Sequence, residues 1–181
     1  PEEHLRRVEA AIGTIETSKL EKVVLARAVD IEFPEAIDPR LVAARLIDLS
    51  ANRDGFIADL SPAGRPGAML VGSSPEVLVK RQGSTVSAFP LAGSSPRRAS
   101  AAEDHLAGQD LLHSSKDLHE HAFVVDHLRR ALTPLCERLD IPDVPQLIST
   151  NEMWHLGTPI SGTLKDKDLT ALELALAVHP T

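Results

Sequence analysis

Two carboxylates lie three residues apart in the segment 115–121, Ser-Lys-Asp-Leu-His-Glu-His. Apolar residues recur at helical spacing from this segment onward, so the pattern predicts a helix on which Asp117 and Glu120 project from nearly the same side. Such a pair can hold magnesium, which prefers oxygen ligands and usually takes one or two protein carboxylates together with water and an anionic substrate. The alternative interpretation is an acidic first turn that complements the helix dipole.

Two further charged residues stand where strands are expected to begin. Lys22 opens the apolar run Lys-Val-Val-Leu. A desolvated amine there could take a proton from water, whereas a lysine that reaches from a strand end into solvent is the plainer interpretation. Glu76 follows the turn sequence Gly-Ser-Ser-Pro. If burial keeps this carboxylic acid protonated, it can donate to a leaving group; the alternative is a surface carboxylate beside a turn.

Small residues end another predicted strand, in the segment 89–94. Gly93 allows close approach of a ligand to the backbone, and the N–H groups around Ala92 and Ser94 can bind a carboxylate. A plain turn is the alternative here. His155 follows the only tryptophan of the chain, and a histidine beside apolar residues is more often part of a core than catalytic.

Composition excludes some classes of protein. The chain has 181 residues and a net charge of −7, from 19 basic and 26 acidic side chains, which argues against a nucleic-acid partner. An acidic protein that binds an acidic substrate needs a cation or a well-placed Lys or Arg. Cys136 is the only cysteine, so no internal disulfide can form and a cytoplasmic setting is expected. No apolar run is long enough for a transmembrane helix, so no membrane partner is expected.

Clusters of predicted strands alternate with helices, and several strands are joined as hairpins. This pattern favours an α/β (α+β) sandwich, with antiparallel or mixed sheets covered by helices, over a doubly wound parallel fold. Capping signals start helices at Asp38, Ser100 and Thr170, and Pro134 is expected to kink or divide the long helix. We expect helices over residues 4–17, 39–50, 101–113, 116–139 and 171–179, and strands over residues 22–33, 55–60, 68–72, 77–81, 85–89, 146–150 and 160–164.

Taken together, six segments of this chain resemble the chorismate-utilising enzymes, and most closely the isochorismate synthases. They occur in the order of the family and extend over nearly the whole chain. The resemblance implies one catalytic domain over residues 1–181, incomplete at its C-terminus, in which helices cover two antiparallel sheets. The matching segments are Lys22–Arg27, Val71–Leu78, Pro90–Ser94, Ser115–His121, Trp154–Leu156 and His179–Thr181.

The same resemblance implies a magnesium-dependent conversion of chorismate to isochorismate. Lys22 matches the general base that activates water for attack on C2, and Glu76 matches the general acid that protonates the departing C4 hydroxyl. Glu120 matches a magnesium ligand, and Asp117 matches the acidic position one turn before it. Five residues match substrate-binding positions: Ala92, Gly93, Ser94, His155 and Thr181.

Other functions remain open at this point. The enzymatic alternatives are a salicylate synthase, which would share both the lysine and the acid, or another chorismate enzyme. A non-catalytic ligand- or metal-binding fragment that needs a partner segment is a different class of function. Family members continue past the position of Thr181, so we expect little activity from this chain alone, pairing with the missing C-terminal segment, and a monomer at full length. Siderophore, salicylate and menaquinone routes are equally compatible with the sequence.

Overall fold

The computed structural model describes residues 2–20 and 22–180, and the chain divides into two compact units. The first unit spans residues 1–37 and holds α1 (Glu2–Thr17). This helix confirms the expectation from the helical spacing of apolar residues over 4–17. The remaining described residues of the unit, 18–20 and 22–37, form no helix or strand.

The strand predicted over residues 22–33 is therefore wrong. An alternating, β-branched run is a local signal, and it forms a strand only where a neighbouring strand completes its backbone hydrogen bonds. None of the strands in the described part of the chain pairs with this run. Its apolar side chains stay exposed instead, including Val24, Ile31 and Phe33.

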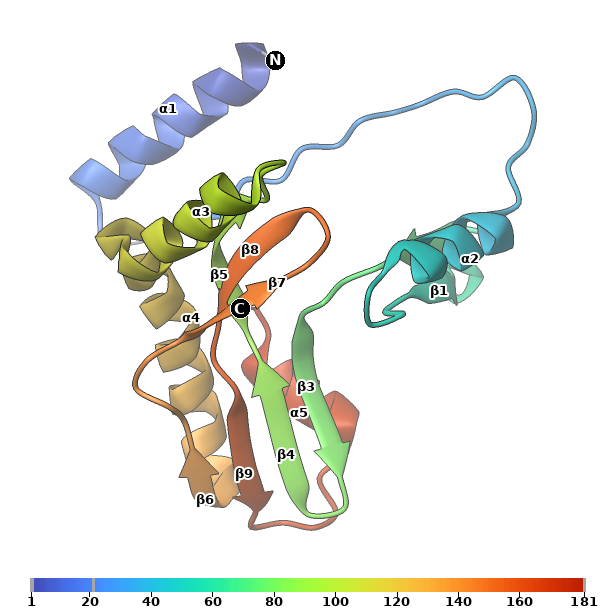
Figure 1. Ribbon diagram of the computed structural model, residues 1–181. Helices are drawn as coiled ribbons and strands as arrows, with labels where there is room; N and C mark the ends of the chain where they lie inside the picture. The colour runs from blue at the N-terminus through green and yellow to red at the C-terminus, as the bar shows by residue number, and fades with distance from the viewer. Residues whose placement is uncertain (1, 21, 181) are drawn as a thin grey trace. The chain divides into compact units, whose positions relative to one another are not determined.

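The second unit spans residues 38–181 and contains three antiparallel sheets, of order β1-β2, β3-β4-β9-β6 and β5-β8-β7 (Figure 1). The strands predicted near residues 55–60, 68–72, 77–81, 85–89, 146–150 and 160–164 are all present. The elements are α2 (Pro39–Leu49), β1 (Phe56–Asp59), η1 (Ser61–Ala63), β2 (Met69–Gly72), β3 (Val77–Gln82), β4 (Thr85–Phe89), β5 (Leu91–Pro96), α3 (Ala101–His113), α4 (Ser115–Leu132), η2 (Thr133–Leu135), β6 (Cys136–Asp140), β7 (Gln146–Ser149), β8 (Met153–Gly157), β9 (Ile160–Leu164) and α5 (Ala171–Val178).

Two pairs of strands connect the two larger sheets. After Pro90, β4 continues into β5, and after residues 158–159, β8 continues into β9. Because β4 pairs with β9 and β5 pairs with β8, the segments β4–β5 and β8–β9 bend together from the four-stranded sheet into the three-stranded sheet. At the bend, the backbone N–H of Thr158 donates to the carbonyl of Pro90 at 3.4 Å. The small-residue segment 91–95 thus begins at the junction of the sheets.

Two of the three predicted helix caps form as expected. The Asp38 carboxylate accepts a hydrogen bond from the Arg40 N–H at 2.9 Å, and Thr170 and Glu173 form a reciprocal capping box at the start of α5. The capping box predicted at Ser100 is wrong, because the Ser100 side chain makes no capping hydrogen bond. The helix starts there all the same, with a backbone bond from Asp104 N–H to the Ser100 carbonyl.

The long helix α4 ends earlier than predicted. It stops at Leu132, and residues 133–135 form one 3-10 turn around Pro134. Proline has no N–H to continue the helix, and its ring clashes with the preceding turn. Residues 136–139, which we expected to continue the helix, instead belong to β6 and pair with β9. Pro134 therefore divides a helix from a strand.

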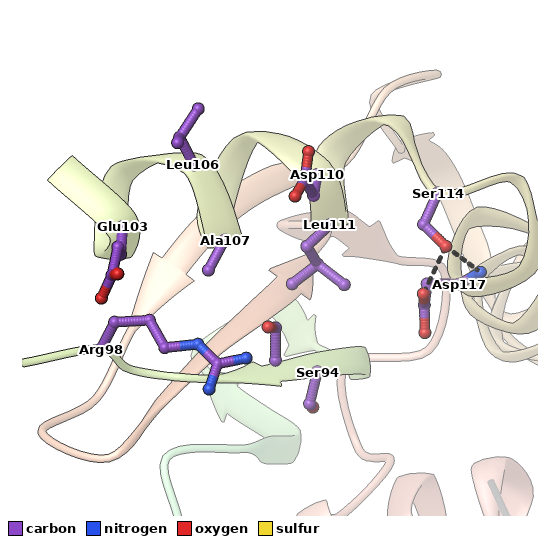
Figure 2. A pocket seen from close by; sticks show the side chains of 10 residues that line it. Ser94, Arg98, Glu103, Leu106, Ala107, Asp110, Leu111, Ser114 and Asp117 are labelled. Atoms are coloured by element: carbon purple, nitrogen blue, oxygen red, sulfur yellow. Dashed lines mark hydrogen bonds between the residues drawn. The ribbon is translucent and has the colours of Figure 1, made fainter.

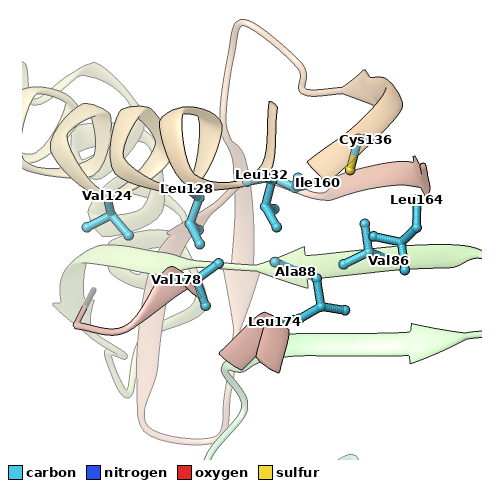
Figure 3. Close-up of a cluster of buried hydrophobic side chains, with 10 residues drawn as sticks. All are labelled: Val86, Ala88, Val124, Leu128, Leu132, Cys136, Ile160, Leu164, Leu174 and Val178. Carbon is cyan, nitrogen blue, oxygen red and sulfur yellow. The ribbon is translucent and has the colours of Figure 1, made fainter. Parts of the chain in front are cut away.

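A single apolar cluster lies between the four-stranded sheet and the helices α4 and α5 (Figure 3). The α4 residues Val124, Leu128 and Leu132 follow one another at intervals of four, so one helix face is buried. In β9, the buried residues Ile160 and Leu164 alternate with exposed ones. Burial of each large aliphatic side chain contributes about 1.5–3 kcal/mol, so this cluster anchors α4 against the sheet.

Candidate functional site

Glu76 lies immediately before β3, and its side chain contacts the start of β5. Its Oε1 atom accepts a hydrogen bond from the backbone N–H of Leu91 at 3.2 Å. The sequence leaves open whether Glu76 is buried or lies on the surface beside a turn, and in the structure it is exposed. The hydrogen bond from the Leu91 N–H holds its side chain against the start of β5.

Ser94 and His155 face each other across β5 and β8. They are register partners, and the Ser94 Oγ lies 2.7 Å from the His155 Nδ1. Burial lowers the pKa of His155 below its ordinary value, and the nearby Glu76 carboxylate opposes this effect with a smaller raising influence. A neutral imidazole is thus favoured, which can exchange a hydrogen bond with a hydroxyl or a ligand.

Gly93 brings the backbone of β5 against the first turn of α4. Its φ angle is +82°, a conformation that side chains with a Cβ rarely adopt. A Cβ at this position would lie 3.1 Å from the Asp117 Cβ and 3.3 Å from the Asp117 carbonyl oxygen. Only glycine fits both the backbone angle and the space. The close neighbour of Gly93 in the structure is the first turn of α4, whereas the approach of a ligand to this backbone stays a prediction.

Asp117 takes part in the cap of α4. Its N–H donates to the Ser114 Oγ at 3.3 Å, and the Ser114 hydroxyl donates in turn to the Asp117 carboxylate (Figure 2). Lys116 lies 3.8 Å from the other carboxylate oxygen, and the Asp117 side chain is 19% exposed. Half-buried Glu120 lies one turn further along the helix. Asp117 therefore lies in the acidic first turn of α4, and one of its carboxylate oxygens accepts the hydrogen bond from Ser114.

Two cavities border this group of residues. Ser94 and Asp117 line one of about 430 Å³, which lies between β5, α3 and the start of α4 (Figure 2). His155 lines another of about 370 Å³, together with Ser73 and Pro75 from the loop before Glu76. Residues from four separate stretches of sequence thus converge around the junction of β5 and β8.

The donor atoms suit a hard cation with few protein ligands. Within residues 2–20 and 22–180, no three or more His, Cys, Asp or Glu side chains are grouped to hold a metal ion. Magnesium does not need such a group, because it keeps several waters and often binds the anionic substrate as well. The carboxylates of Asp117 and Glu120 are of the type and number that it takes from a protein.

Two of the predicted site residues, Lys22 and Thr181, are not among those described above. Lys22 belongs to the first unit and is half-buried, in the stretch without helix or strand. The residues grouped above all belong to the second unit. Thr181 lies outside the described residues. Ala92 is part of the group, through its carbonyl oxygen, which lies 3.0 Å from the Nδ1 atom of His121.

An ion pair between Arg97 and Asp104 supports the other face of strands β5 and β8, and it was not predicted from the sequence. Asp104, only 7% exposed, accepts hydrogen bonds from the Arg97 guanidinium, the Arg98 N–H and the Trp154 indole. The guanidinium of Arg97 also lies 4.4 Å from the Trp154 ring centroid. Hydrogen bonding to Arg97 is the main cause that lowers the pKa of Asp104 to about 2. The only local signal was a carboxylate near two arginines, which carries no information without the fold.

None of the helices in the described part of the chain is both long enough and apolar enough to cross a bilayer.

Comparisons with known proteins agree with this architecture. The chain is 43% identical to isochorismate synthase DhbC of Bacillus subtilis over 183 residues, which is all of this chain and 46% of that protein. It is 38% identical to isochorismate synthase EntC of Escherichia coli K12, over 96% of this chain and 43% of that protein. The chain therefore spans about half the length of the curated relatives it matches.

The crystal structure of DhbC from Bacillus anthracis superposes with a TM-score of 0.89 at 38% identity, over 96% of this chain and 46% of that chain. This match confirms the expected fold, in which helices cover antiparallel sheets. The family model described as "Chorismate binding enzyme" matches residues 1–181. The chain therefore belongs to the chorismate binding enzyme family.

Proposed function

We propose that the protein of which this chain is part or whole converts chorismate to isochorismate with the help of magnesium. The observation that carries the proposal is the convergence of Glu76, Ser94 and His155 at the junction of β5 and β8. This convergence occurs in a chain whose curated relatives are named isochorismate synthases. Residues 1–181 act as one incomplete catalytic domain in this proposal, and the lone cysteine supports a cytoplasmic setting.

The proposed reaction is a displacement with migration of both ring double bonds. Lys22 takes a proton from water as the water oxygen bonds to C2 of chorismate. The C1–C2 double bond shifts to C1–C6 and the C5–C6 double bond shifts to C4–C5. The C4–O bond breaks, and Glu76 gives its proton to the departing hydroxyl, which leaves as water. One proton is gained by Lys22 and one is lost by Glu76, so exchange with solvent restores both groups. The exposure of Glu76 is compatible with such reprotonation.

Glu120 and Asp117 are the residues that we propose to hold magnesium. A bound magnesium ion would offset the repulsion between a dianionic substrate and a protein of net charge −7. Asp117 already shares one oxygen with the helix cap, so Glu120 is the stronger candidate for direct contact. The proposed substrate-binding set is completed by backbone groups of the segment Ala92–Ser94 and by the residues His155 and Thr181.

Product analysis with chorismate and magnesium tests this proposal. It is best done on the chain itself and on a chimera in which the chain is followed by the remaining part of the Bacillus subtilis relative. We expect little turnover by the 181-residue chain, because it matches 46% of the Bacillus subtilis relative and a site without its supporting residues loses preorganisation. The chimera is expected to produce isochorismate, and Lys22→Ala or Glu76→Gln should abolish that product.

Other products would point to other functions. Salicylate together with pyruvate would move the assignment to a salicylate synthase. Metal-dependent chorismate binding without any product, from both the chain and the chimera, would favour a non-catalytic binding fragment. Strong turnover by the 181-residue chain alone would contradict the expectation that the site is incomplete.

A further inference from the structure

His121 is the most enclosed titratable residue near the candidate site. It lies on α4, directly after Glu120, and is only 2% exposed. Its Nδ1 atom is 3.0 Å from the carbonyl oxygen of Ala92, and its Nε2 atom is 2.8 Å from the hydroxyl of Thr158, which is 1% exposed. One imidazole ring therefore joins α4 both to β5 and to the connection between β8 and β9.

The contact with Ala92 fixes a hydrogen on one ring nitrogen. A backbone carbonyl oxygen can only accept a hydrogen bond, so the His121 Nδ1 must be the donor. Ala92 comes just before Gly93, whose left-handed backbone turns against Asp117. The His121–Ala92 bond is thus one residue away from the close contact between Gly93 and Asp117.

Together these contacts close a loop of interactions around the proposed metal position. From Asp117 the helix leads to Glu120 and His121; the ring of His121 leads to Ala92; and Gly93 leads back to Asp117. Displacement of His121 would leave the carbonyl of half-buried Ala92 without this donor, which is unfavourable. The segment would then be able to move relative to both carboxylates.

We infer that His121 is a positioning residue, which holds the Ala92–Ser94 segment in register with the carboxylates of Asp117 and Glu120 through a hydrogen bond from its Nδ1. It does not touch substrate or metal in this role. The inference that His121 positions β5 rests only on the contacts of His121. Its consequence for the metal and substrate rests on the function proposed above.

The first test is nuclear magnetic resonance of the imidazole nitrogens in the 181-residue chain. The expected result is a hydrogen on Nδ1 of His121, assigned by loss of its signals in His121→Asn. A ring whose Nδ1 carries no hydrogen would overturn the inference, because the bond to Ala92 could not exist. The hydrogen is observed in the unmodified chain, and correlation of the ring nitrogens with the backbone of His121 assigns the signals if the variant does not fold.

The second test is hydrogen–deuterium exchange over residues 91–95. We expect exchange in His121→Ala to be about tenfold faster than in the parent chain, which is the effect of losing one buried hydrogen bond. His121→Asn should restore most of the protection, since the asparagine amide can donate from a place near Nδ1. His121→Gln, whose amide reaches toward Thr158 instead, should not.

His127 provides a matched control on the same helix. Its Nε2 lies 2.9 Å from the carbonyl oxygen of Val178, so it also joins α4 to a backbone carbonyl, but in α5. His127→Ala should leave exchange over residues 91–95 unchanged. Equal acceleration by His127→Ala and His121→Ala would show a general loosening of α4 and would overturn the specific role of His121.

Magnesium titration then connects the inference to function. His121→Ala should weaken magnesium binding about tenfold with recovery in His121→Asn, whereas Glu120→Gln should abolish it. Unchanged magnesium affinity in His121→Ala would overturn the link to the metal position. If the parent chain and the chimera bind no magnesium at all, the proposed function fails, and the exchange and nitrogen signals still decide whether His121 positions β5.

Discussion

The Arg97 guanidinium and the Asp104 carboxylate form an ion pair with a contact of 2.6 Å between Nη2 and Oδ2, behind the strand that carries Ser94. Arg97 also donates to the carbonyl of Thr150 at 2.9 Å, before β8. The pair therefore ties α3 to both β5 and the β7–β8 turn. Through these elements it supports the two strands whose other face presents Ser94 and His155.

Asp104 gives the stability of the fold a predictable dependence on pH. Its pKa in the folded chain is about 2, lowered from an ordinary value of 3.8. Because the folded pKa is the lower one, the stabilisation is fully present above about pH 4 and is lost as the pH falls toward 2. Asp104→Asn should therefore lower the free energy of unfolding at neutral pH, and the difference from the parent should shrink below pH 4.

Urea unfolding followed by circular dichroism between pH 7 and pH 2.5 measures this dependence. Asp110→Asn is the control, since Asp110 is an exposed carboxylate on the same helix. If the free energies of unfolding of the parent and Asp104→Asn differ by the same amount over the whole pH range, the ion pair is not the cause of the pH dependence.

Leu128 should be among the most sensitive positions of the apolar cluster. It is 1% exposed on the face of α4 that packs against the four-stranded sheet. Leu128→Ala leaves a cavity and is expected to cost about 2–5 kcal/mol in the free energy of unfolding. Leu176→Ala, on α5 with 68% exposure, should change it by no more than about 0.5 kcal/mol. Similar losses for the two variants would mean that this cluster is not the core of the second unit.

Local signals in the sequence were enough to predict most helices and strands. The Asp38–Pro39 start and the Thr170 capping box are set by residues within one turn, and both form. The strand at residues 22–33 failed because a strand depends on a partner that the local pattern does not contain. β5 and β8 were missed for a related reason, because both strands form by pairing with each other. In β5, small residues, glycine and proline also hide the strand pattern.

The same distinction applies to the candidate site. Motifs located Glu76, Ser94 and His155, and the fold brings these residues together. The roles of His121 and Asp104 come from contacts with residues 29 and 50 positions away, Ala92 and Trp154. Such contacts depend on how the strands bend from one sheet to the other, which no spacing along the chain expresses.

Gly93 should tolerate no side chain. Gly93→Ala must place a Cβ at φ +82°, which costs about 1–2 kcal/mol for an L-residue, and must push against Asp117 as well. Gly83→Ala is the matched control, because Gly83 also has a positive φ, of +61°, but no atom within 4 Å of the added Cβ. Urea unfolding should show a larger loss for Gly93→Ala, and exchange of the first turn of α4 should rise only in that variant. An equal loss for the two variants would contradict the close contact with Asp117.

Glu76 should control the protonation of His155. The Glu76 carboxylate raises the pKa of His155, in opposition to burial, which lowers it. Glu76→Gln removes the negative charge and leaves burial unopposed, so the pKa of His155 should fall further below its ordinary value. Titration of the His155 ring signals by nuclear magnetic resonance measures the change directly.

The control is Glu103→Gln, because Glu103 is a carboxylate on α3 that has no such effect on His155. An unchanged His155 pKa in Glu76→Gln would mean that the two side chains do not lie together in solution. A fall, by contrast, would establish in the isolated chain the electrostatic contact between the proposed acid and a proposed substrate-binding histidine.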